Sequence, residues 1–179
     1  MEMHAADFVP WRRRSIRLRG YDYRTPDAYS VTVCTADRLC LLAQAGSGVI
    51  TLSELGDIAA AAWLDLPRHF PNVELDAFVI MPNHVHGIVC FESAVPDPDG
   101  TEARRFGDVV AGSLSAVVGA FKSASARCIN GARGTEGAAV WQRGFHERVI
   151  RPDRMLEAIR LCIANNPANW ARDAEHVNE

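Results

Sequence analysis

The sequence of 179 residues has no uninterrupted apolar run long enough to cross a membrane. Residues 1–19 are polar, end in arginines and lack the apolar core of a secretory signal peptide. The five cysteines form no CxxC pair, which argues against a disulfide framework or a zinc site. Unpaired cysteines of this kind are typically small, buried, apolar residues of proteins in a reducing compartment. Together these absences predict a cytoplasmic protein with no membrane partner.

Charge is distributed unevenly along the chain, although the net charge of −3 does not favour general binding of nucleic acid. Arginines crowd into a short N-terminal stretch beside Trp11, whereas acidic residues are spread over residues 97–102 and the C-terminal tail. A basic arm with an aromatic neighbour favours contacts with DNA phosphates, and a solvated terminus is the alternative interpretation. The arginines of this arm are Arg12, Arg13, Arg14, Arg17 and Arg19.

Apolar periodicity predicts a single α+β domain. Some stretches alternate apolar and polar residues as strands do, and others repeat apolar residues at helical spacing. The order β-α-β-β-α-β plus a C-terminal helix is the ferredoxin-like split βαβ arrangement, an antiparallel sheet with helices on one face. The expected strands are 29–35, 73–80, 84–91 and 146–150, and the expected helices are 53–70, 113–129 and 153–166.

The same interpretation divides the chain into three parts. Residues 1–28 form the basic N-terminal arm, residues 29–170 the folded domain and residues 171–179 a C-terminal tail. Within the domain, the connection over 36–48 is expected to contain a short hairpin around 39–42.

The most informative stretch is the predicted strand, turn and strand over residues 77–90. Pro82 and Asn83 supply the turn, and the strand that follows opens with His84-Val85-His86. Because side chains alternate along a strand, both imidazoles project to one face about 7 Å apart, while Val85 points into a core. Two imidazoles on one rigid strand are half of a plausible divalent-metal site. Solvated or structurally hydrogen-bonded histidines are the alternative.

The histidine–hydrophobe–histidine motif of residues 84–86 resembles the signature of HUH single-tyrosine transposases, specifically the branch of REP-associated tyrosine transposases. Further segments are similar to the same family, occur in its order and cover nearly the whole chain. A lone motif of this kind is weak evidence, whereas the ordered set is specific. The matching segments are 13–18, 20–23, 33–35, 81–86, 121–123, 141–146 and 159–170.

The resemblance implies a metal-dependent endonuclease and strand transferase that acts on single-stranded DNA, often at hairpin ends. It implies that His84 and His86 bind Mg²⁺ or Mn²⁺, and that a tyrosine of the last helix attacks the phosphodiester. The third metal ligand is a polar residue one helical turn after this tyrosine, which matches Asn166. Relatives include both dimers and monomers, so a homodimer is one of two alternatives.

The nucleophile position departs from the family pattern, because it holds Cys162. The chain's tyrosines, Tyr21, Tyr23 and Tyr29, all lie before or at the first predicted strand. In the first interpretation cleavage is lost and the domain persists as a DNA-binding module; in the second, Cys162 is itself the nucleophile. In the third, an N-terminal tyrosine reaches the site. The spacing of Cys162 from its apolar neighbours also predicts that this cysteine is a small buried residue on the inner face of the last helix.

Several other candidates have ordinary structural interpretations beside the functional one. Asn166 precedes a proline and is expected to end the last helix as well as to bind metal. Lys122 is expected on the outer side of the second helix, either in contact with phosphate or simply solvated. His146 either faces the site or packs beside Trp141, and Arg148 stands where relatives commonly have histidine.

The sequence thus predicts a transposase-like HUH domain that binds single-stranded or hairpin DNA and a divalent metal, with impaired cleavage. The alternative is a catalytically inactive, domesticated DNA-binding module. A hydrolase that uses the histidine pair on RNA is a third interpretation, but the chain lacks a second histidine motif to support it.

Overall fold

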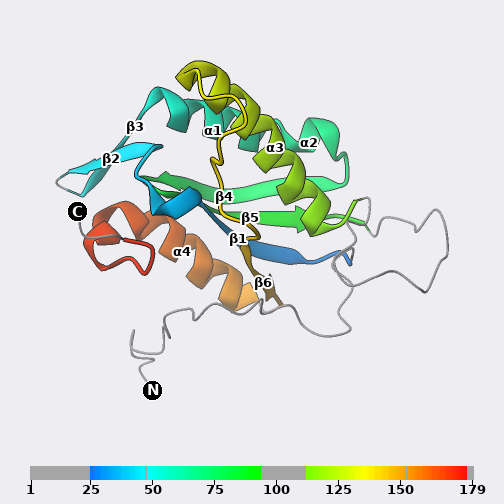
Figure 1. The fold of residues 1–179 in the computed structure, drawn as a ribbon. Coiled ribbons are helices and arrows are strands. Elements are labelled where there is room, and N and C mark those ends of the chain that lie inside the picture. Colours follow the sequence, from blue (N-terminus) through cyan, green and yellow to red (C-terminus); the bar gives the residue numbers. More distant parts are fainter. Residues whose placement is uncertain (1–24, 47, 94–111, 152, 177–179) are drawn as a thin grey trace.

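The computed structural model describes residues 25–46, 48–93, 112–151 and 153–176 (Figure 1). The segments outside these ranges include the arginines at positions 12–19, so the predicted basic arm lies outside the described residues. The strands are β1 (Ala28–Cys34), β2 (Ala43–Gly46), β3 (Val49–Leu52), β4 (Val73–Met81), β5 (His84–Phe91) and β6 (His146–Ile150). The helices are α1 (Glu54–Leu64), α2 (Leu66–His69), α3 (Leu114–Arg133) and α4 (Asp153–Asn169), with short 3-10 turns η2 (Ala36–Arg38) and η3 (Trp170–Arg172).

The main sheet has the strand order β4-β5-β1-β6, and each neighbouring pair is antiparallel. This order confirms the predicted ferredoxin-like arrangement, in which β1 and β5 are the central strands. Strand β5, which carries His84 and His86, is therefore hydrogen-bonded on both sides. A backbone held on both edges gives the two imidazoles a rigid base.

The connection between β1 and α1 differs from the expectation. Its hairpin is formed by β2 and β3 and lies later in the chain than the expected 39–42. The reason is that the backbone of Leu42 is hydrogen-bonded to other segments. Its N–H donates to the Pro82 carbonyl at 3.0 Å, and its carbonyl accepts from Ser53 N–H at 2.9 Å. The first predicted helix is also divided into α1 and α2, because Pro67 has no N–H to continue it.

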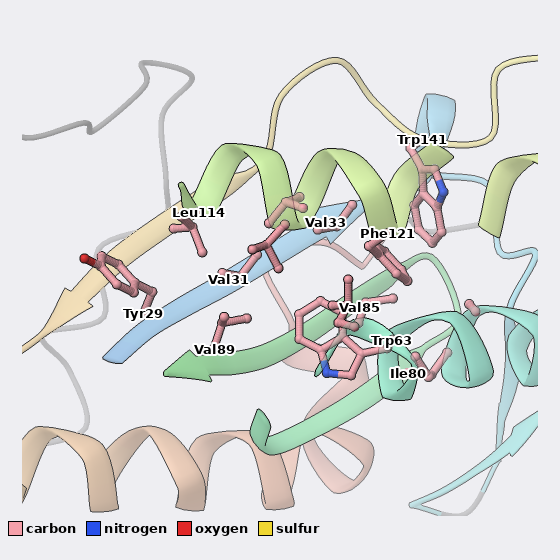
Figure 2. Packing of buried hydrophobic residues seen from close by; sticks show 14 of the residues in the cluster. Tyr29, Val31, Val33, Trp63, Ile80, Val85, Val89, Leu114, Phe121 and Trp141 are labelled. Atoms are coloured by element: carbon pink, nitrogen blue, oxygen red, sulfur yellow. The ribbon is translucent and has the colours of Figure 1, made fainter. Parts of the chain in front are cut away.

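One face of the sheet packs on α1 and α3 and forms the larger apolar core. Val85 and Val89 of β5 point into it, together with Trp63 of α1 and Phe121 of α3 (Figure 2). The rings of Trp63 and Phe121 make an edge-to-face contact with centroids 5.3 Å apart. The alternation predicted for Val85 is confirmed, and it sends the flanking His84 and His86 to the opposite face.

The C-terminal helix α4 covers that opposite face (Figure 1). The expected placement of helices on one face holds for α1 and α3, and α4 lies on the other. The reason is that alternate positions of the second face are also apolar and need cover: Ile88 of β5 and Ile150 of β6 pack against Ile163 of α4. Among the described residues, every helix falls short of the length and apolarity that a membrane crossing requires.

The larger core leaves no room for a side chain at Gly87 of β5. A Cβ at this position would lie 2.6 Å from Trp63 Cζ2 and 2.9 Å from Phe78 Cβ. We expect Gly87→Ala to lower the free energy of unfolding by about 1–3 kcal/mol, because the core must shift to admit the methyl group. Urea denaturation followed by tryptophan fluorescence measures the change.

The matched control is Gly119→Ala on α3, where an added Cβ meets nothing within 4 Å. This substitution should raise the free energy of unfolding by about 0.5–1 kcal/mol, because alanine loses less backbone entropy in a helix. Equal stability of Gly87→Ala and the wild type would contradict the close packing described at Gly87.

Candidate functional site

The hydrogen bonds of Asn83 determine the protonation pattern of His84. The Asn83 Nδ2 group donates to the Glu175 carbonyl at 2.7 Å and to the Arg38 carbonyl at 3.3 Å. The Oδ1 of Asn83 must then be the acceptor in its 3.0 Å contact with His84 Nδ1, so His84 carries its proton on Nδ1. The lone pair of the neutral ring lies on Nε2.

His84 Nε2 faces the C-terminal segment that follows α4. The Asp173 Oδ2 atom lies 4.0 Å from it, too far for a hydrogen bond, and the Trp170 ring lies 6.2 Å from the imidazole ring. The His84 side chain is only 2% exposed. A buried imidazole with its lone pair aimed at a carboxylate is the arrangement of a metal ligand whose other nitrogen is held by an outer hydrogen bond.

His86 is held from two different elements. Its Nε2 lies 3.1 Å from Ser30 Oγ on β1, and its Nδ1 lies 3.3 Å from Asn166 Nδ2 on α4. The structure therefore brings Asn166 next to His86, as the predicted metal site requires. The proline after Asn166 led us to expect that the helix ends at Asn166. This expectation is wrong, because α4 continues past Pro167 to Asn169.

Both imidazoles are neutral at neutral pH. Burial lowers the pKa of His84 to about 4, although the Glu175 carboxylate acts in the opposite direction. Burial also lowers the pKa of His86 to about 4; the neighbouring His84 adds to this effect and Asp173 opposes it. Neutral imidazole is the form that binds metal ions, so the site is ready for a cation without loss of a proton.

A divalent metal fits part of this arrangement. His84 and His86 offer imidazole nitrogens, and Asn166 offers an amide oxygen if its side chain turns. No group of three His, Cys, Asp and Glu side chains lies at coordination distance in the described part of the chain. This nitrogen-rich set suits a first-row transition metal such as Mn²⁺ better than Mg²⁺, and the Asn166 side chain must turn to close it around the ion.

The cysteines correct one expectation. Cys162 is exposed on α4 and is not the buried inner-face residue that its spacing predicted; Ile163, the next residue, makes the contact with the sheet. Cys40 and Cys128 are exposed as well, whereas Cys34 is buried and Cys90 is half-buried. The expectation failed because a helix in contact with one sheet face buries a narrow stripe. Cys162 lies one turn before Asn166 and is accessible.

Lys122 has a structural contact that the sequence did not indicate. Its Nζ donates to the carbonyls of Gln142 at 2.6 Å and Gly144 at 2.9 Å, and burial lowers the pKa of its ammonium group. The side chain is thus not simply solvated on the outer side of α3, because it holds the loop before β6. Contact between Lys122 and a phosphate stays a prediction.

Strand β6 extends the histidine face of the sheet. The register pairs Thr32 of β1 with His86 on one side and with His146 on the other, and it pairs Ser30 with Arg148. Paired residues of antiparallel strands point to the same face, so His146 and Arg148 lie on the His86 side of the sheet. Arg148 is exposed and supplies a positive charge next to the strand that carries Ser30.

Most of the residues around His84 and His86 could not be identified from the sequence. Ser30, Arg38, Asp173 and Glu175 belong to a strand, a turn and the expected tail, and none of them belongs to a motif. Only Asn83 carried a signal, as a turn residue next to the histidine. Contacts between segments more than 100 residues apart, such as Arg38 with Glu175, have no local pattern by which to find them.

Comparison with known proteins shows a relative in sequence and similarity in fold to a solved structure. No model of a known protein family matches the chain. A protein of Haemophilus influenzae (strain ATCC 51907 / DSM 11121 / KW20 / Rd), described as uncharacterized, is 32% identical over 173 residues, which cover 93% of this chain and 94% of the relative. The structure of a REP-associated tyrosine transposase bound to a REP hairpin superposes with a TM-score of 0.54, at 20% identity over 93% of this chain and 78% of that one. The chain therefore shares the fold of that transposase.

The low pKa values of the two histidines predict a specific loss of stability in acid. An unfolded histidine titrates near pH 6.5, whereas these two stay neutral in the folded protein down to about pH 4. The unfolded chain therefore takes up protons first. Their contribution to stability is complete above about pH 6.5 and is lost as the pH falls toward 4.

We expect the free energy of unfolding in EDTA to fall on the order of 2 kcal/mol between pH 7 and pH 5, as measured by urea denaturation. The fall should be smaller in His84→Gln/His86→Gln and unchanged in His69→Gln, which alters an exposed histidine of α2. An equal fall in the double variant and the wild type would show that the buried imidazoles do not cause it.

Proposed function

The chain belongs to the same protein family as the Haemophilus influenzae relative, and we propose that it binds single-stranded or hairpin DNA at its histidine face with a divalent metal ion. The histidine face is the side of the sheet that carries His84 and His86 and is covered by α4. The shared fold with a transposase whose structure contains a REP hairpin supports hairpin DNA as the partner class. The proposal assigns His84, His86 and Asn166 as ligands of Mg²⁺ or Mn²⁺.

The observation that carries the proposal is the contact between Asn166 and His86. These residues are separated by 80 positions in the sequence, and α4 lies on the sheet so that the Asn166 amide reaches the imidazole at 3.3 Å. Beside them, His84 presents a lone pair on Nε2 because its Nδ1–H donates a hydrogen bond to Asn83 Oδ1. Three uncharged donor side chains gathered on one sheet face form a plausible cation site.

The surrounding residues supply the rest of a phosphate-binding site. When bound, the ion would polarise and align a phosphodiester group. Asn83 orients His84, Ser30 orients His86, and the exposed Arg148 on the same face adds a positive charge for the DNA backbone. The arginines at positions 12–19 add further charge in the arm that precedes β1.

A second candidate function is a DNA-binding module without cleavage. It is favoured by the composition of α4, which contains Cys162 and no tyrosine. Tyr29 cannot replace the missing nucleophile, because its side chain is fully buried on the opposite face of the sheet against Phe91. Tyr21 and Tyr23 lie outside the described residues. Loss of cleavage ranks first, and attack by the exposed Cys162 thiolate ranks second.

Metal binding is tested by thermal unfolding with Mn²⁺ alone. At a concentration of one hundred times the Kd, Mn²⁺ should raise the Tm of the wild type by roughly 5–10 °C, because it binds only the folded protein. The double variant His84→Ala/His86→Ala should show no rise, and His69→Ala on α2 should behave as the wild type. A rise that persists in the double variant would place the ion elsewhere and remove the metal site from the proposal.

DNA binding is tested by fluorescence anisotropy with a labelled hairpin oligonucleotide. The affinity should fall about tenfold or more between 50 and 200 mM salt, because several phosphate contacts release counterions. Replacement of the five arginines at 12–19 by glutamine should weaken binding, whereas Arg68→Gln on α2 should not. Equal affinity in Mn²⁺, in EDTA and in the double histidine variant would favour the metal-free module, and absence of binding would overturn the proposal.

Cleavage is tested separately by looking for a covalent protein–DNA adduct on a denaturing gel. The first interpretation predicts no adduct with Mn²⁺ and a single-stranded substrate. An adduct that Cys162→Ser abolishes would establish the thiol as the nucleophile. An adduct that survives Cys162→Ser would contradict both interpretations of Cys162.

A further inference from the structure

We propose that Asp173 is an additional ligand of the divalent ion, so that the C-terminal turn supplies a carboxylate to the histidine face. This inference rests on the proposed function, because it concerns the same ion. It adds a negatively charged oxygen to a set of ligands that is otherwise uncharged. Asp173 belongs to none of the sequence motifs and lies in the segment that was expected to be a tail.

The unprotonated nitrogen of His84 lies opposite the carboxylate of Asp173. The proton of His84 is on Nδ1, so Nε2 directs a lone pair toward Asp173 Oδ2 at 4.0 Å. Two electron-rich atoms thus face each other with no hydrogen between them, at side-chain exposures of 2% and 14%. Such an arrangement is unfavourable by itself and becomes favourable when a cation lies between the two atoms.

The distance between His84 Nε2 and Asp173 Oδ2 suits two ligands of one ion. Ligands of one octahedral ion with bonds of about 2.1 Å lie about 3.0 Å apart when adjacent and about 4.2 Å apart when opposite. The separation of 4.0 Å between His84 Nε2 and Asp173 Oδ2 is close to the longer of these two distances. Both atoms therefore lie near the separation that one ion would require of two of its ligands.

The turn that carries Asp173 is fixed in place by its neighbours. The Glu175 carboxylate pairs with Arg38 at 2.9 Å and accepts from the Cys34 thiol at 3.5 Å, and Arg38 also donates to the Ala174 carbonyl at 3.3 Å. Asn83 links the same turn to His84, since it donates to the Glu175 carbonyl. Asp173 is thus presented to His84 by a clamped segment, and little conformational entropy remains to be lost when it binds the ion.

The two oxygens of Asp173 make different contacts, so the proposed role of Oδ2 as a metal ligand can be tested separately. Oδ1 accepts a hydrogen bond from Glu175 N–H at 2.7 Å, whereas Oδ2 faces His84. Asp173→Asn can keep the acceptor for Glu175 and replace the second oxygen by an amide group that does not bind metal. Asp173→Ser also keeps an oxygen acceptor for this N–H and removes the second oxygen altogether.

The experiment measures Mn²⁺ affinity directly by room-temperature electron paramagnetic resonance of the purified full chain, in which hexaaqua Mn²⁺ loses its signal on binding. We expect Asp173→Asn and Asp173→Ser to raise the Kd about tenfold or more, because each removes a charged ligand. Asp57→Asn, which removes the same charge from an exposed position of α1, should bind as the wild type does. Thermal unfolding in EDTA checks that each variant is folded.

The outcomes separate this inference from the proposed function. If both Asp173 variants bind Mn²⁺ as tightly as the wild type while His84→Ala/His86→Ala does not bind it, the carboxylate is not a ligand and the histidine site stands. If the wild type binds no Mn²⁺, both the metal site and the role of Asp173 fall. If Asp57→Asn weakens binding as much as Asp173→Asn does, the effect is one of net charge and the inference is overturned.

Discussion

The packing of α4 on the second face of the sheet is the interaction on which the site depends. Ile163 packs in one cluster with Ile88 and Ile150, and this apolar contact holds the helix against the second face of the sheet. Asn166 lies three residues after Ile163, so the same packing delivers its amide to His86. One stripe of apolar residues thus stabilises the fold and assembles residues from opposite ends of the domain. A helix on the other face, beside α1 and α3, would leave His84 and His86 without a partner from the C-terminal region.

Asn83 has a comparable importance among the polar residues. As part of the turn between β4 and β5 it is buried, and a buried amide must find partners for its polar atoms. It finds them in three segments: the Arg38 turn, the Glu175 turn and His84. Because both of its donors are used, its oxygen is left to accept from His84 Nδ1, and the tautomer of His84 follows. The electrostatic character of the site, a neutral imidazole with a lone pair directed at a carboxylate, is therefore a consequence of how one turn residue is hydrogen-bonded.

The sequence predicted the part of this architecture that has a local pattern. Alternation along 84–91 placed Val85 in the core and both histidines on the other face, and the order of elements led to the observed sheet. Helical periodicity shows which side of a helix is apolar but not which face of a sheet it covers, so the position of α4 was not foreseen. The same limit explains why Cys162 is exposed although its apolar neighbours predicted that it would be buried. The contacts of Lys122 with the loop before β6, and of Asp173 with His84, join segments that no periodicity relates.

The resemblance in sequence to HUH transposases rests in part on the two histidines and Asn166, and the chain shares the fold of a REP-associated tyrosine transposase. The most direct measurement of the central claim is a crystal structure of the protein grown with Mn²⁺, with anomalous scattering used to locate the ion. The account predicts an anomalous peak within about 2.5 Å of His84 Nε2 and of a ring nitrogen of His86, with Asn166 turned toward it. A structure in which this position holds no peak while both imidazoles keep their hydrogen bonds to Asn83 and Ser30 would contradict it.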